Sequence, residues 1–178
     1  NRSASILSID LAGRGRDKFV VSTETLDLKT NQIQFDNISQ TVGLSTEALV
    51  ENHVQEDHKH GVYPSAVVLE IEPGSWVDTE KYWKNFFNQL GIVVYPRPPK
   101  GSKFNRARPM VREMNQGLIR INKWLTKKIY HESIDKPSYF ELLKEELAAL
   151  QPVMPVSPNI LDSLSHGFNF LRKVKIKG

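Results

Sequence analysis

The chain has 178 residues, of which 39% are hydrophobic and 25% are charged, a composition typical of one compact globular domain. It contains no cysteine, which excludes disulfide bonds and thiolate zinc sites. No stretch is apolar for long enough to span a bilayer, so we expect no membrane partner. We expect residues 1–178 to form a single domain that has been cut from a longer chain.

The formal net charge of +4 conceals two halves of opposite sign. Residues 1–94 hold 8 basic and 13 acidic residues, whereas residues 95–178 hold 16 basic and 7 acidic residues. The stretch from Arg97 to Lys128 has ten basic residues against one acid, Glu113. Such a concentration of cations predicts a phosphate-binding surface and a nucleic-acid partner, although a solvated basic face without a ligand is the alternative.

The spacing of apolar and turn-forming residues predicts alternating strands and helices. β-Branched runs indicate strands, and amphipathic spacing behind serine or threonine caps indicates helices. In chain order we expect strands at 6–11, 19–28 and 33–38, a helix at 46–58, a strand at 65–71, a helix at 79–90, a strand at 92–95, a helix between Pro109 and Gly117, an edge segment at 118–121, and helices at 138–150 and from 159 onward. This order predicts an α/β fold: an RNase H-like mixed five-stranded sheet, with three antiparallel strands and then parallel strands, flanked by helices.

Asp10 ends the first strand, and a carboxylate there is costly to bury unless a cation compensates it, although capping of the following turn is an alternative role. In the predicted fold, Glu70 or Glu72 ends the neighbouring fourth strand, and Asp162 begins a helix that lies over both strands. We rank Glu70 ahead of Glu72 because it is embedded in the apolar run. Three carboxylates at one sheet edge would repel one another without cations, and oxygen ligands without cysteine favour Mg²⁺ or Mn²⁺.

Two such ions about 4 Å apart would stabilise the attacking water and the leaving oxygen of a phosphodiester, so the carboxylates predict a nuclease. His166 lies one helical turn after Asp162 and could ligate a metal or orient a water. We assign His53, His58 and His60 to a solvated helix end, because no partner has zinc spacing. Five basic residues are expected to bind the DNA backbone with little sequence preference and strong salt sensitivity: Lys100, Lys103, Arg106, Arg108 and Arg112.

Three segments together resemble the C-terminal nuclease domain of the large terminase subunit of tailed bacteriophages: Ser8–Asp17, Val67–Glu70 and Asn159–His166. The resemblance spans nearly the whole chain and includes Lys103 and Arg106 ahead of a helix. It implies a metal-dependent endonuclease that cuts concatemeric viral double-stranded DNA during genome packaging, with Asp10, Glu70 and Asp162 holding two Mg²⁺ or Mn²⁺ ions. The chain departs from the family at 157–159, where many members carry further acids before the final aspartate.

The resemblance also implies partners: an N-terminal ATPase motor domain, a portal protein and the small terminase subunit, working in the host cell cytoplasm. The chain has no Gly-x-x-x-x-Gly-Lys-Ser/Thr loop, so we expect the nuclease domain without its motor.

Other functions fit parts of the same pattern. A Holliday junction resolvase or a transposase-like nuclease would use the same carboxylates and would be distinguished by a preference for branched DNA. An actin-like phosphotransferase would need a second phosphate loop, which we do not find in the sequence. A non-catalytic DNA-binding or motor-docking module is a further alternative, in which the carboxylates would be the remains of a metal site that no longer functions.

Overall fold

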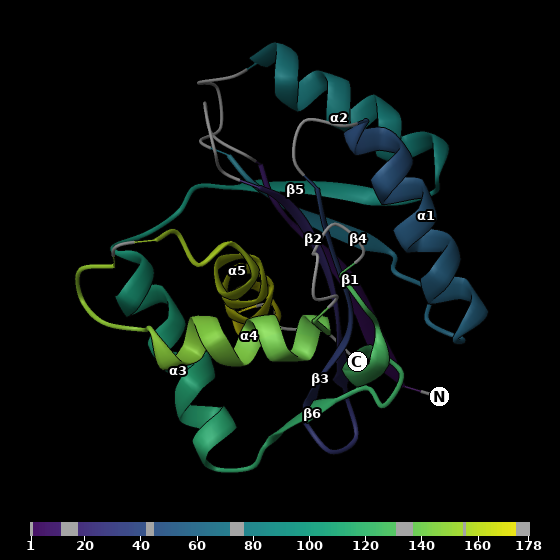
Figure 1. Cartoon of the computed structure of the whole chain (residues 1–178). Coiled ribbons are helices and arrows are strands. Elements are labelled where there is room, and N and C mark those ends of the chain that lie inside the picture. Colours follow the sequence, from purple (N-terminus) through teal and green to yellow (C-terminus); the bar gives the residue numbers. More distant parts are fainter. Residues whose placement is uncertain are drawn as a thin grey trace.

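The computed structural model describes residues 2–11, 18–41, 45–71, 77–130, 137–154 and 156–173. These residues form a mixed sheet with helices on both faces (Figure 1). The elements in chain order are β1 (Ser3–Asp10), β2 (Phe19–Asp27), β3 (Ile33–Thr41), α1 (Thr46–Lys59), β4 (Ala66–Glu70), α2 (Val77–Gln89), β5 (Val93–Arg97), α3 (Lys103–Asn115), β6 (Ile119–Ile121), a 3₁₀ turn η1 (Leu125–Lys127), α4 (Tyr139–Ala148) and α5 (Asn159–Lys173). None of the described helices is long and apolar enough to cross a membrane.

The strand order is β5-β4-β1-β2-β3-β6. β1, β2 and β3 form the antiparallel meander expected from the sequence, and β4 and β5 then add in parallel beside β1. The sheet has six strands rather than the expected five, because the edge segment expected at 118–121 pairs in parallel with β3. The remainder of the predicted mixed architecture is confirmed.

Each face of the sheet carries its own hydrophobic core. Side chains alternate along a strand, so Leu7 and Ile9 of β1 face α1 and α2, where they pack with Trp83 and Phe87. Ile6 faces the opposite way, into the core formed with α3, α4 and α5. The same alternation places Asp10 on the α5 face, together with Ile6. The sheet therefore presents its last β1 side chain to the helix that carries Asp162.

Helix α3 begins at Lys103, six residues before the Pro109 start expected from the sequence. Ser102 caps it, because the Ser102 hydroxyl accepts a hydrogen bond from the backbone N–H of Asn105 at 3.2 Å. Pro109 lies inside the helix on its exposed side, where it removes one backbone hydrogen bond without ending the helix. Lys103 and Arg106 are therefore part of the helix and do not precede it.

The assignment of His53 to a solvated helix end is wrong. His53 is fully buried, and its ring nitrogens contact Thr23 at 2.6 Å and Ser39 at 2.7 Å. The face of α1 that carries His53 packs on β2 and β3, whose inward polar side chains satisfy the ring. Burial lowers the pKa of His53 well below its usual range, so the ring is neutral. His58 and His60 are exposed, as expected.

Candidate active site

Hydrogen bonds among three buried serines hold helix α5 against the sheet. The Ser8 hydroxyl of β1 donates to the carbonyl of Ser163 at 2.7 Å, and the Ser163 hydroxyl lies 3.0 Å from the carbonyl of Ser8. The Ser163 hydroxyl also lies 2.9 Å from the hydroxyl of Ser22 on β2. All three serines are completely buried. This reciprocal contact fixes the first turn of α5, and with it the neighbouring Asp162, over the centre of the sheet.

Three carboxylates come together at the edge of the sheet where β1 and β4 end. Ile9 lies opposite Leu69, so the next residues, Asp10 and Glu70, lie at the same end of adjacent parallel strands. Burial, with smaller effects from the charges of Glu70 and Asp162, raises the pKa of Asp10 to about 8, although Lys103 and Arg106 act in the opposite direction. Asp10 therefore lies in a site that disfavours one more negative charge unless a cation is present. Glu72 and residues 12–17 lie outside the described residues.

Two cations from α3 pair with these carboxylates. Lys103 Nζ lies 3.0 Å from Asp162 Oδ2 and 2.5 Å from the hydroxyl of Ser157. Arg106 Nη1 lies 2.8 Å from Glu70 Oε1, and both side chains are more than four-fifths buried, at 14% and 13% exposed. Burial raises the pKa of Asp162, and the adjacent ammonium of Lys103 opposes that rise. The helix that the sequence shows as merely basic thus supplies the counter-charges of the site.

His166 follows Asp162 by one turn of α5, and its Nε2 atom is buried without a hydrogen-bond partner among the described residues. Burial lowers the pKa of His166 to about 4, and the cationic side chains of Arg106, Lys173 and Arg97 contribute in the same direction. The ring is therefore neutral at neutral pH. A neutral imidazole with an unpaired nitrogen can accept a hydrogen bond from a water or ligate a metal ion.

Glu146 is a fourth acidic residue near the site that the sequence reasoning missed. Its Oε1 atom accepts the backbone N–H of Leu161 at 2.9 Å, so Glu146 of α4 caps the N-terminus of α5. Burial raises its pKa to about 7, and the nearby charge of Asp162 acts in the same direction. The sequence does carry one sign of this role. Glu146 lies among Leu142, Leu143 and Leu150, so it places an acidic residue on the apolar side of the predicted helix.

The donor set suits a hard divalent cation. It combines clustered carboxylates, one of them protonated near neutral pH when no cation is present, with an unpaired imidazole nitrogen. As the side chains stand, no three described histidine, aspartate or glutamate residues are grouped closely enough to hold a metal ion. Lys103 and Arg106 instead neutralise one oxygen of Asp162 and one of Glu70. The chemistry of the residues fits a divalent metal, provided that these side chains rearrange when it binds.

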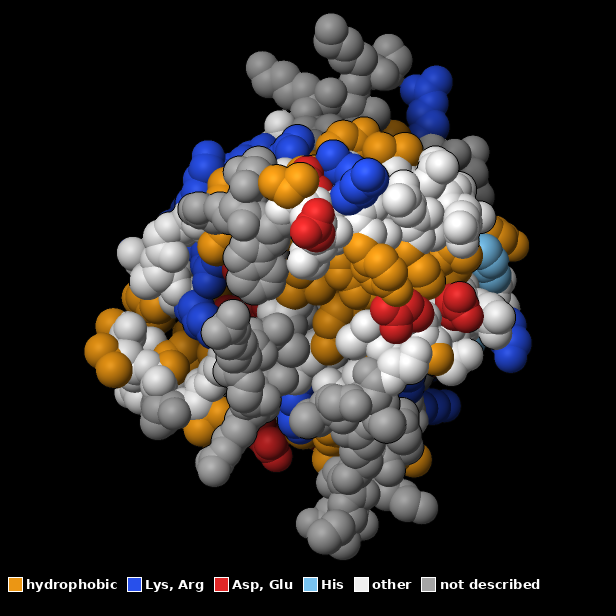
Figure 2. Space-filling model, turned by 90° about the horizontal axis from the view of Figure 1, so that it is seen from above, with side chains coloured by type: hydrophobic (Ala, Val, Ile, Leu, Met, Phe, Trp, Pro, Cys, Tyr) orange, Lys and Arg blue, Asp and Glu red, His pale blue; other side chains and the backbone are white. Residues whose placement is uncertain are grey.

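The other predicted DNA-contacting residues remain on the surface. Lys100, Arg108 and Arg112 are exposed, and no ion pair is found for any of the three in the described structure. Figure 2 shows Lys and Arg side chains gathered on the left side of the face seen from above. The five predicted cations therefore divide into two that engage carboxylates and three that face solvent.

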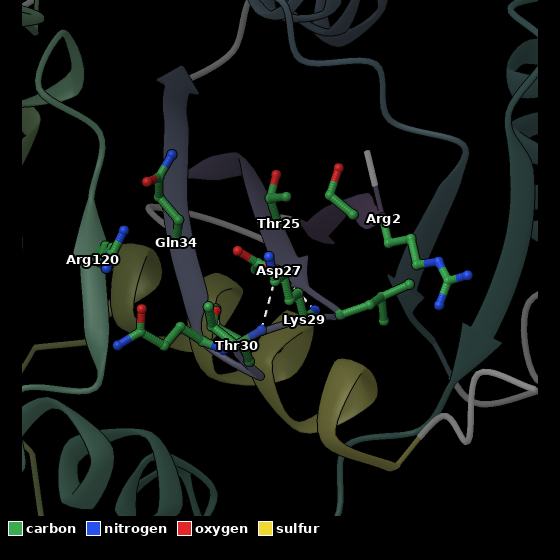
Figure 3. Close-up of a pocket in the computed structure, with 11 residues that line it drawn as sticks. Arg2, Thr25, Asp27, Lys29, Thr30, Gln34 and Arg120 are labelled. Carbon is green, nitrogen blue, oxygen red and sulfur yellow. Dashed lines mark hydrogen bonds between the residues drawn. The ribbon is translucent and has the colours of Figure 1, made fainter. Parts of the chain in front are cut away.

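The structure has one cavity next to the carboxylates and a larger one far from them. A cavity of about 270 Å³ has Lys103 and Ser157 in its wall and so adjoins them. A larger one, of about 710 Å³, lies by the turn between β2 and β3, with Arg2, Lys29 and Arg120 around it (Figure 3). Ser3 pairs with Asp27 at that end of β1, whereas Asp10 is at the other end. The larger cavity is therefore remote from the carboxylates.

The sequence matches no protein-family model, and the search of curated proteins also found no match. Several solved structures are similar to the structure of this chain. The nuclease domain of human cytomegalovirus terminase, soaked with Mn, has a TM-score of 0.67 at 12% identity, over 98% of this chain and 85% of that one. The P22 large terminase nuclease domain has a TM-score of 0.57 at 11% identity, over 96% and 82%.

Fowlpox virus resolvase, in complex with Holliday junction DNA, has a TM-score of 0.51 at 17% identity, over 94% of this chain and 97% of that one. These neighbours, together with the strand order, show that the chain has the RNase H-like fold expected from the sequence. Large terminase nuclease domains recur among the similar structures, in agreement with the resemblance noted in the sequence.

Proposed function

We propose that this chain is a divalent-metal-dependent DNA endonuclease, with Asp10, Glu70 and Asp162 as its metal ligands. The convergence of these carboxylates from β1, β4 and α5 carries the proposal. Asp10 has no basic partner of its own among the ion pairs of the described residues, and its raised pKa shows that it is protonated near neutral pH unless a further cation binds beside it. The fold shared with terminase nuclease domains and a junction resolvase supports the same function.

In this proposal, two Mg²⁺ or Mn²⁺ ions would activate the attacking water and stabilise the leaving oxygen of the phosphodiester. Asp10, Glu70 and Asp162 would hold these ions, and His166 would be available to a metal or its water. Lys103 and Arg106 would exchange their carboxylate contacts for phosphate oxygens, because ions that bind the carboxylates release both cations. Lys100, Arg108 and Arg112 would hold the DNA backbone without reading bases.

The biological setting follows from the family resemblance. We propose that the substrate is concatemeric viral double-stranded DNA and that cutting accompanies genome packaging in the host cell cytoplasm. An ATPase motor domain, a portal protein and a small terminase subunit would be the partners. The similarity to the cytomegalovirus and P22 terminase nuclease domains supports this setting. Junction resolution is the second candidate, supported by the similarity to fowlpox resolvase, and a preference for four-way over linear DNA would favour it.

Cleavage of supercoiled plasmid by the purified domain tests the proposal. We expect nicked and linear products in Mg²⁺ or Mn²⁺ and none in EDTA. Asp10→Asn should slow cutting by more than about 10²-fold, since loss of outer partners of a metal site alone costs about that much. Asp27→Asn is the matched control, because Asp27 lies at the opposite end of the sheet and should leave the rate unchanged.

Metal binding, followed by calorimetric titration with Mn²⁺, separates an active nuclease from a vestigial site. We expect the parent to bind Mn²⁺ and Asp10→Asn to bind it much more weakly. A folded parent that binds DNA but neither Mn²⁺ nor Mg²⁺ would establish the non-catalytic module instead. Metal-dependent cutting that survives in Asp10→Asn, Glu70→Gln and Asp162→Asn would place the active site elsewhere.

A further inference from the structure

A small apolar pocket opens directly beside the carboxylates. Its volume is about 270 Å³, below the range of pockets for drug-sized ligands, so it suits a single planar ring system. Figure 1 shows the chain between α4 and α5 passing the first turn of α3, and side chains from these two segments form the pocket. The apolar lining residues are Phe104, Pro152, Met154, Val156 and Pro158.

One side chain separates this pocket from the candidate metal site. Lys103 lines the pocket, and its ammonium group contacts Asp162 at 3.0 Å. Ser157 also lines the pocket and lies 2.5 Å from the same ammonium. A nucleotide whose phosphate reached Lys103 would therefore have its sugar and base at the entrance of the pocket.

The chemistry of the pocket suits a nucleobase. Among the described residues, no acidic side chain lines the pocket, so these residues do not repel a polyanion. Phe104 offers an aromatic face, and bases of any sequence stack on such rings. The guanidinium of Arg108 lies 6.0 Å from the centre of the Phe104 ring, and Arg112 follows one turn later on the same side of α3. Phe104, Arg108 and Arg112 thus form a row along α3. The aromatic ring at its start suits a base, and the two arginines suit the phosphates of the same DNA strand.

We propose that this pocket binds one unstacked nucleobase next to the phosphate that is cut; the inference rests on the proposed nuclease function and specifies its substrate. A base inside an intact duplex is stacked on both faces and cannot enter. Extruding it from paired DNA carries a cost that an already unpaired base does not. The chain therefore prefers DNA with an extrahelical or unpaired base at the cut site, irrespective of the sequence around it.

The test measures binding in EDTA, where cutting is absent; without metal the Lys103 ammonium contacts Asp162 and Ser157 and keeps its third donor for a phosphate. Two duplexes of equal length are compared, one fully paired and one with a single extrahelical 2-aminopurine. We expect the bulged duplex to bind about tenfold more tightly, a ratio equivalent to about 1.4 kcal/mol and within the usual effect of stacking on an aromatic side chain. We also expect the 2-aminopurine fluorescence to fall on binding, because the base stacks on Phe104.

Phe104→Ala should bring the affinity ratio of the two duplexes close to one and remove the fluorescence change, whereas Phe104→Trp should keep both. Phe104 is partly exposed and lies outside both hydrophobic cores, so we expect both variants to fold. Val153→Ala is the matched control in the same loop, because Val153 is 83% exposed and does not line the pocket. It should keep the wild-type ratio.

The inference is overturned if the wild-type protein binds both duplexes equally or binds neither. It is also overturned if Phe104→Ala and wild-type protein show the same ratio and the same quenching. The plasmid assay separates the two proposals. Metal-dependent cutting with a ratio of one would retain the nuclease and remove the base pocket. A tenfold ratio without any metal-dependent cutting would retain the pocket as a DNA-binding feature and remove the nuclease.

Discussion

Glu24 buries a carboxyl group between β2 and α5. The residue is completely buried, and neither carboxyl oxygen has a hydrogen-bond partner among the described residues. A methyl group placed on Gly167 would come within 2.0 Å of the Glu24 carboxyl, so the glycine is what allows α5 to pass over it. Burial, with a smaller effect from the charge of Asp36, raises the pKa of Glu24 well above its ordinary value. The group is therefore protonated in the folded protein over a wide range of pH.

Glu24→Gln should change how stability depends on pH. The folded wild-type protein keeps the Glu24 proton, whereas the unfolded chain releases it above about pH 4.5, so rising pH favours the unfolded state. Glutamine carries no such proton. The free energy of unfolding of Glu24→Gln, minus that of the wild type, should therefore increase by about 1.4 kcal/mol for each pH unit above 4.5, until the folded pKa is reached. Urea unfolding at pH 4.5, 5.5 and 6.5 measures this difference.

Asp27→Asn provides the control of opposite sign. Asp27 is partly exposed, and the backbone N–H groups of Lys29 and Thr30 lower its pKa. Its stabilising contribution is therefore present above the unfolded pKa and disappears as the pH falls through the lower folded value. The difference between Asp27→Asn and wild type should therefore stay constant from pH 4.5 to 6.5 and should move in favour of the variant only when the pH falls below about 3.8. A Glu24→Gln difference that does not vary with pH would show that Glu24 is ionised in the folded protein.

Helix α5 carries Asp162, and α4 holds its first turn in place. The carboxylate of Glu146 accepts the Leu161 amide, so removing it leaves a buried helix end without that partner. Glu146→Ala should lower the free energy of unfolding by about 1 kcal/mol, the usual cost of a lost helix cap. Glu146→Gln retains an oxygen acceptor and should keep most of the stability. Guanidinium unfolding and amide exchange in the first turn of α5 are the measurements.

Glu145→Ala is the matched control, because Glu145 precedes Glu146 on α4 but is exposed. It removes the same charge from the same helix without touching α5. Equal losses of stability in Glu145→Ala and Glu146→Ala would assign the effect to helix propensity or net charge and not to the cap.

The helices and strands show which structural features can be predicted from the local sequence pattern. The helices expected at 138–150 and from 159 onward begin within one residue of the predicted starts, because the signals for a helix start lie within a few residues of the sequence; for α4 that signal is the capping box of Ser138 and Glu141. Strand order alone predicts that Asp10 and Glu70 lie at the same end of neighbouring strands, and the pairing of β1 with β4 puts them there. The pairing of Glu146 with Leu161 joins two helices, and the burial of His53 depends on polar groups from two strands. The periodicity of apolar residues within one segment cannot predict such contacts, because they join residues from different elements.

Across the whole molecule, cations occur at both ends of the sheet but face different surroundings. Lys100 lies just before α3, and Arg108 and Arg112 lie on it; the first turn of this helix lines the apolar pocket and pairs with the carboxylates. Arg2, Lys29 and Arg120 surround the cavity at the opposite end (Figure 3). All six side chains are exposed, so replacing either set with alanine changes the net charge equally and disturbs little packing. The pair of triple variants separates local contact with DNA from overall charge.

The salt dependence of DNA affinity should change only in the α3 set. Each phosphate contact contributes about 0.9 to the slope of the logarithm of affinity against the logarithm of salt concentration, because binding releases condensed counterions. The Lys100→Ala, Arg108→Ala, Arg112→Ala triple variant should therefore lose about 2 to 3 from that slope in fluorescence-anisotropy titrations. The Arg2→Ala, Lys29→Ala, Arg120→Ala triple variant should keep the wild-type slope. Equal changes in both would mean that DNA responds to the net charge of the molecule, and a change confined to the second set would move the DNA path to the far end of the sheet.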